Sequence, residues 1–87
     1  MSHTINWEPA INDLRELTPD ILKRIIKKVG SIAQEPLRYA ERLSGYKLFK
    51  LRIGDYRAVL DIKETEIVVV LIGHREKVYQ TLQRRAK

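Results

Sequence analysis

Three strand-length segments joined by very short connections constrain the fold of this chain more than any other feature. The segments are rich in β-branched and apolar residues and span residues 46–53, 56–62 and 66–72. The connections, Gly54-Asp55 and Lys63-Glu64-Thr65, are short enough for hairpins. Residues 46–72 are therefore predicted to form a three-stranded antiparallel meander.

Two helical segments precede the meander. Pro9 suits the first turn of a short helix that reaches about Leu17. Thr18-Pro19-Asp20 is a second helix start, with a capping hydroxyl, a proline at the first helical position and an acid in the first turn. The helix that follows has an apolar stripe opposite a basic side and ends at Gln34-Glu35-Pro36. The stripe consists of Ile21, Leu22, Ile25, Ile26, Val29, Ile32 and Ala33.

The remaining segments complete the predicted topology. Residues 3–7 alternate weakly and are predicted to form a first strand, residues 37–45 a loop, and a last helix starts near Arg75. The order is then β-α-α-β-β-β-α. We predict an α+β fold in which an N-terminal helical hairpin covers one face of a small, mainly antiparallel sheet. With 87 residues, the chain is predicted to form a single domain over residues 1–87.

Composition narrows the classes of function. The chain has no cysteine, and its two histidines, His3 and His74, are far apart, so we predict no metal site and no cofactor. The N-terminus lacks a signal-like segment, and the longest apolar run, residues 67–72, is too short to cross a bilayer. The expected location is the cytoplasm.

The net charge of +6 is unevenly distributed along the chain. Residues 1–41 contain six basic and six acidic groups, whereas residues 42–87 contain eleven basic and five acidic groups. This asymmetry favours a polyanionic partner, above all a nucleic acid. A solvated basic surface without a partner is the alternative.

Strand alternation gathers several cationic side chains on one face of the meander. Lys50 and Arg52 share a face of the first meander strand, and Arg57 lies on the same exposed face of the next strand. Arg75 and Tyr79 are four residues apart at the start of the last helix. RNA cleavage by its own 2′-hydroxyl needs a base, cations that stabilise the phosphorane, and an acid for the 5′-oxygen. A solvent-exposed mixture of lysine and arginine is the alternative interpretation.

The sequence resembles the RelE/ParE toxin superfamily along nearly the whole chain. The resemblance rests on the helical hairpin, on Arg42-Leu43-Ser44-Gly45 with the block from Tyr46 to Arg57, and on Gly73-His74-Arg75-Glu76-Lys77-Val78-Tyr79. It implies the RelE-like microbial RNase fold. It also implies the toxin of a type II toxin–antitoxin system, a metal-independent endoribonuclease that cleaves mRNA in the ribosomal A site and leaves a 2′,3′-cyclic phosphate.

The resemblance also implies roles for individual residues. Lys50 helps to activate the 2′-hydroxyl, Arg57 stabilises the phosphorane, Arg75 is the general acid, and Tyr79 acts as base or stacks on a nucleotide. The implied substrate-binding residues are Arg52, Lys47 and His74. The general base stays open among Tyr79, Lys50 and His74, because Leu48 stands where some RelE enzymes carry a second lysine. Arg57 and Arg75 have the alternative of ion pairs with Asp61 or Glu76.

Partners follow from the same resemblance. The expected ones are a RelB-like antitoxin and mRNA on the ribosome, with contacts to 16S rRNA, and no membrane. Two other functions are considered. One is a ParE-like inhibitor that binds DNA gyrase without RNase activity, and the other is an RNA-binding module without turnover.

Overall fold

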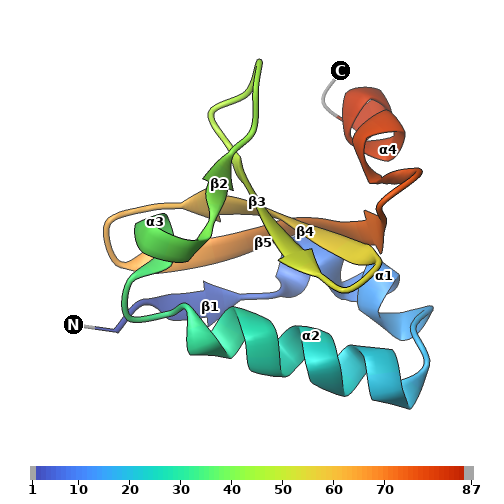
Figure 1. Ribbon diagram of the computed structural model, residues 1–87, viewed down its shortest axis with the longest axis horizontal. Helices are drawn as coiled ribbons and strands as arrows, with labels where there is room; N and C mark the ends of the chain where they lie inside the picture. The colour runs from blue at the N-terminus through green and yellow to red at the C-terminus, as the bar shows by residue number, and fades with distance from the viewer. Residues whose placement is uncertain (1, 86–87) are drawn as a thin grey trace.

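A computed structural model describes residues 2–85, so residues 1, 86 and 87 of the predicted domain lie outside the described part. Five strands form one sheet in the order β1-β5-β4-β3-β2 (Figure 1). The strands are β1 Thr4–Asn6, β2 Glu41–Arg42, β3 Phe49–Ile53, β4 Tyr56–Ile62 and β5 Glu66–His74. The helices are the 3-10 turn η1 Glu8–Ala10, α1 Ile11–Arg15, α2 Pro19–Ser31, α3 Pro36–Tyr39 and α4 Val78–Arg85.

The sheet confirms the predicted meander. β3, β4 and β5 pair in antiparallel order, and β1 adds a parallel strand beside β5. The turn between β3 and β4 depends on Gly54, whose φ of 61° lies in the left-handed region. Residues 37–45 differ from the prediction, because the expected loop contains α3 and the edge strand β2. The first meander strand also begins at Phe49 instead of residue 46.

The helical hairpin covers one face of the sheet, as predicted. Pro19 opens α2, and Ile25 and Val29 from its apolar stripe are completely buried. They pack against the inward-facing residues of the strands, among them Leu51 and Leu60. The stripe therefore fixes which face of the meander is interior and which face is left for other contacts.

The opposite face of the sheet is covered by α4. Figure 1 shows α2 along one side of the sheet and α4 on the other. A second hydrophobic cluster joins α4 to the strands and consists of Leu43, Val59, Leu71, Val78 and Leu82. A β-bulge contributes to this cluster: Val59 pairs with Leu71 and Leu60 with Val69, so Val70 has no partner in β4.

Asp13 links α1, β5 and α4 by three hydrogen bonds. Its carboxylate accepts the backbone N–H of Ile72 at 3.2 Å and two N–H groups of Arg85 at 3.0 and 3.1 Å. The side chain of Asp13 is only 12% exposed, and the hydrogen bond with Asp13 raises the pKa of Arg85. One carboxylate therefore fastens the end of α4 to the body of the protein.

Removing this carboxylate is expected to destabilise the protein and loosen α4. Asp13→Ala leaves the Ile72 N–H and the Arg85 guanidinium without their acceptor, which costs about 1–3 kcal/mol of unfolding free energy. Glu35→Ala is the control, because the Glu35–Arg38 pair is exposed and its loss changes stability by at most about 0.5 kcal/mol. Denaturant unfolding measures both, and equal stability of the two variants contradicts the linking role of Asp13.

Candidate active site

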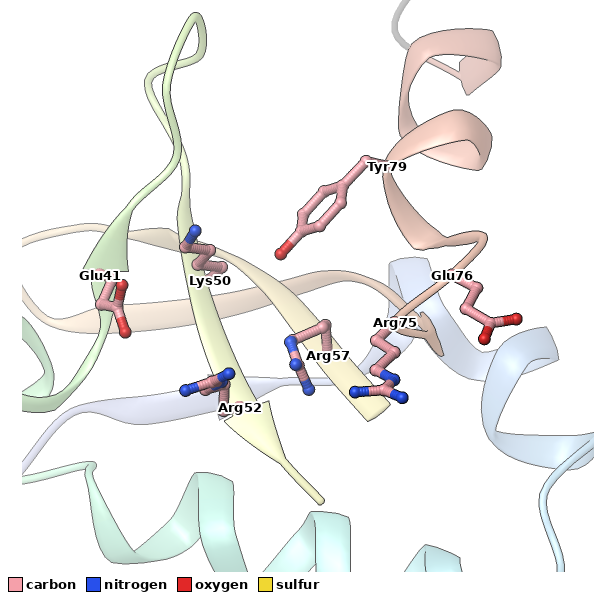
Figure 2. Close-up of a pocket in the computed structure, with 7 residues that line it drawn as sticks. All are labelled: Glu41, Lys50, Arg52, Arg57, Arg75, Glu76 and Tyr79. Carbon is pink, nitrogen blue, oxygen red and sulfur yellow. The ribbon is translucent and has the colours of Figure 1, made fainter. Parts of the chain in front are cut away.

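A cavity of about 640 Å³ opens on the α4 side of the sheet. Figure 2 shows β2 with Glu41 on one side of it and the start of α4 with Tyr79 on the other, with Lys50 and Arg57 between them. Four cations, two carboxylates and one phenol line it: Lys50, Arg52, Arg57, Arg75, Glu41, Glu76 and Tyr79. Such an excess of positive charge in a concave site attracts a phosphate group.

The strand register brings three of the cations together. Lys50 and Arg52 alternate on β3, and Arg57 on β4 is directly opposite Arg52. On the other side of β3, Glu41 in β2 is directly opposite Lys50. Directly opposite residues have side chains on the same face, which places all four around one surface. The alternation in the sequence predicted this arrangement for the three cations.

Arg57 differs from the prediction because it is buried, with only 8% of its surface exposed. Its Nη1 donates hydrogen bonds to the carbonyl oxygens of Gly54 and Tyr56, both at 2.9 Å. Among residues 2–85, no ion pair within 4.0 Å joins it to Asp61 or Glu76. A guanidinium has five N–H groups, so Nε and Nη2 remain available to a phosphate oxygen in a fixed orientation.

Arg75 lies in the turn before α4 instead of at the helix start, because α4 begins at Val78. Its backbone N–H donates to the carbonyl oxygen of Asp55 at 2.8 Å, which anchors this turn to the β3–β4 turn. Its side chain is exposed and reaches the cavity. Tyr79 follows in the first turn of α4, where its ring packs partly against the second hydrophobic cluster. Figure 2 shows its hydroxyl directed into the cavity.

Two of the predicted substrate-binding residues do not line the cavity. His74 follows Gly73, the partner of Arg57, so strand alternation turns its ring to the other face of the sheet. There it lies edge-to-face on Tyr56, with a centroid distance of 5.7 Å, and its Nδ1 accepts the Glu76 N–H at 3.3 Å. Lys47 is exposed in the segment between β2 and β3.

No sequence pattern placed Glu41 in the cavity, and Glu76 was expected only as an alternative ion-pair partner of Arg57 or Arg75. Glu41 belongs to a strand of two residues, which is too short to produce a recognisable alternation. Glu76 stands in the turn before α4, where the predicted helix boundary was wrong. The placement of both carboxylates in the cavity therefore follows from tertiary contacts and not from a local sequence pattern.

We also searched residues 2–85 for a metal site and for a membrane-spanning helix. Within residues 2–85, no group of three or more histidine or carboxylate side chains is placed to hold a metal ion. None of the helices in this range combines the length and hydrophobicity that a membrane-spanning helix requires.

Comparisons with known proteins agree with this fold. Residues 8–79 match the family model described as the ParE toxin of the type II toxin–antitoxin system parDE. The match covers most of the 87 residues, so the chain belongs to this family, within the RelE/ParE superfamily of type II toxins. A search of curated protein sequences found no significant match.

Solved structures of RelE toxins share the fold. A chain of the toxin–antitoxin complex RelBE2 from Mycobacterium tuberculosis is 30% identical, with a TM-score of 0.76, covering 86% of this chain and 100% of that one. A free E. coli RelE mutant is 24% identical, with a TM-score of 0.77 and 98% coverage of both chains. The archaeal RelE–RelB complex from Pyrococcus horikoshii OT3 contains a chain that is 18% identical, with a TM-score of 0.72 and coverages of 90% and 100%.

Proposed function

We propose that this toxin is a metal-independent endoribonuclease that cleaves mRNA in the ribosomal A site, in the cytoplasm. The observation that carries the proposal is the convergence of Lys50, Arg52, Arg57 and Arg75 on one cavity beside the hydroxyl of Tyr79. The scissile phosphate is the natural occupant, because arginine binds phosphate oxygens through paired hydrogen bonds. The 2′-hydroxyl of the ribose adjacent to this phosphate is the nucleophile.

The cations stabilise the phosphorane that forms when the 2′-oxygen attacks. Arg57 is the most constrained of them, since two backbone carbonyls fix its guanidinium. A charge that is already oriented needs no reorganisation when negative charge develops, so it lowers the barrier more than a mobile one. Lys50 adds a second charge to the same oxygens, and Arg52 binds a neighbouring phosphate.

The wall formed by α4 serves the leaving group. Arg75 acts as general acid toward the 5′-oxygen, and Tyr79 stacks on a nucleotide or transfers a proton through its hydroxyl. His74 takes no direct part, because its ring lies on the other face of the sheet. Lys47 serves as an outer contact to RNA beyond the cavity.

Cleavage on translating ribosomes tests the proposal, with mRNA 5′ ends mapped after addition of the purified toxin. Arg75→Ala is the variant of choice, because this exposed side chain makes no hydrogen bond among residues 2–85 and its loss leaves the fold intact. We expect a rate about 10²–10³-fold below wild type. Lys63→Ala removes an equal charge from the exposed β4–β5 turn and is expected to cleave normally. Absence of cleavage by the wild-type protein contradicts the proposal.

The second candidate is inhibition of DNA gyrase, which the match to the ParE family model favours. A binding inhibitor needs no arrangement of acid, base and phosphate-binding groups around one cavity. A supercoiling assay distinguishes the two functions. Inhibited supercoiling without RNA cleavage supports the gyrase inhibitor, and RNA cleavage with unaffected supercoiling supports the endoribonuclease.

We further propose that a RelB-like antitoxin neutralises the toxin by covering or displacing α4. RelB accompanies RelE in several of the similar structures, including those from P. horikoshii and E. coli. Two features of this chain support that mode. α4 is fastened mainly by Val78, Leu82 and the Asp13–Arg85 pair, and the cavity beside it is cationic. An acidic, partly disordered partner that folds on binding suits such a surface.

Hydrogen exchange on the free and antitoxin-bound toxin is expected to show the change at α4. Covering α4 raises protection over residues 73–85, whereas displacing it lowers protection there. Association is expected to be fast and to slow with added salt, because opposite charges steer the encounter. Unchanged protection over residues 73–85 contradicts both modes, even if the complex itself forms.

A further inference from the structure

We propose that Glu41 is the general base that removes the proton from the 2′-hydroxyl, an assignment that rests on the proposed endoribonuclease function. Glu41 lines the cavity from β2, directly opposite Lys50 in the strand register. Among residues 2–85, no ion pair within 4.0 Å involves its carboxylate, and no hydrogen bond from a neighbouring side chain occupies it. The carboxylate is therefore available to a bound hydroxyl.

Glutamate suits this step better than the other groups in the cavity. A glutamate side chain is normally ionised at neutral pH and accepts a proton directly, whereas lysine and tyrosine must first lose their own. The histidine that would be the usual alternative, His74, lies on the other face of the sheet. Arginine remains protonated in proteins, so none of the arginines of the cavity can serve as the base.

The position of Glu41 also fits the geometry of the reaction. In phosphoryl transfer, the attacking and leaving oxygens lie roughly in line on opposite sides of phosphorus. Base and acid therefore belong on opposite walls of the site. Figure 2 shows Glu41 on the β2 side and Tyr79 and Arg75 on the α4 side, with Lys50 and Arg57 between them. A phosphate bound by the central cations has a proton acceptor on one side and donors on the other.

The step balances without any further reactant. The Glu41 carboxylate takes the proton of the 2′-hydroxyl as the 2′-oxygen forms a bond to phosphorus. The bond between phosphorus and the 5′-oxygen breaks, and its electron pair goes to the 5′-oxygen, which takes a proton from Arg75 or Tyr79. The products are a 2′,3′-cyclic phosphate and a 5′-hydroxyl. Glu41 then returns its proton to water, and the acid is reprotonated from water.

Lys50 assists Glu41 in activating the 2′-hydroxyl. Its ammonium and the Glu41 carboxylate occupy directly opposite positions, so the two charges approach the same ribose. The ammonium stabilises the 2′-oxygen as it loses its proton, while the carboxylate receives that proton. Activation of the 2′-hydroxyl is thus shared between a base on β2 and a cation on β3.

Glu76 is the other carboxylate in the cavity and the natural competitor. It lies beside Arg75 on the α4 wall, and Figure 2 shows its carboxylate directed away from Arg57. A base in that place would stand on the side of the leaving group. The in-line geometry therefore favours Glu41 over Glu76.

Glu41→Gln tests the assignment, because the amide keeps the size of the side chain and cannot accept the proton. We expect an RNA cleavage rate about 10²–10⁴-fold below wild type. Binding of an RNA with a 2′-deoxy residue at the cleavage position is expected to change little. For a carboxylate base, we expect the wild-type rate to fall on acidification and this fall to be absent in the variant. Glu64→Gln, in the exposed β4–β5 turn, is the matched control and is expected to cleave normally.

The outcomes separate the base assignment from the proposed function. Cleavage by Glu41→Gln at the wild-type rate overturns the assignment but not the endoribonuclease function. A loss of cleavage in Glu76→Gln but not in Glu41→Gln has the same meaning. A loss of RNA binding as large as the loss of cleavage also overturns it, since Glu41 then acts in binding. Failure of the wild-type protein to cleave RNA overturns both. Thermal unfolding of each variant checks that the fold is intact.

Discussion

The two-residue turn between β3 and β4 is the constraint on which the site depends. Gly54 adopts a left-handed conformation there, which fixes the register that sets Arg52 opposite Arg57. The carbonyl groups of the turn then act as acceptors: that of Gly54 binds the Arg57 guanidinium, and that of Asp55 binds the backbone N–H of Arg75. A single hairpin thus orients one arginine and anchors the segment that presents another. A register slip of one residue would reverse the strand faces and disperse the cations.

The second layer of the molecule turns this cationic strand surface into a cavity. The bulge at Val70 brings apolar side chains of β5 to the outer face, where α4 packs on them. Gly73 lies against Val78 of α4, where an added Cβ would come within 3.4 Å of the valine side chain. α4 in turn supplies Tyr79 to the wall of the cavity. α4 is short and has few buried residues. A partner that moves α4 would therefore change the site, because α4 carries Tyr79.

The sequence predicted those parts of the structure that arise from local patterns. The meander, α2 and the shared face of Lys50 and Arg52 all follow from periodicity and turn composition. Alternation indicates the side on which a strand residue lies but not its depth, so the burial of Arg57 was missed. The bulge at Val70, the two-residue strand that presents Glu41 and the docking of α4 depend on contacts distant in sequence. Glu41 therefore lines the cavity although no sequence pattern placed it there, and His74 lies on the other face because β5 extends beyond the predicted strand to include it.

We propose that this cavity cleaves RNA through the substrate's own 2′-hydroxyl. The most direct test compares an mRNA that carries a normal ribose at the mapped cleavage position with one that carries a single 2′-deoxyribose there, on the same ribosomes. We expect the first mRNA to be cut to a 2′,3′-cyclic phosphate and a 5′-hydroxyl, and the second to bind and stay intact. Cleavage of the deoxy substrate, or a product with a 5′-phosphate, contradicts this mechanism.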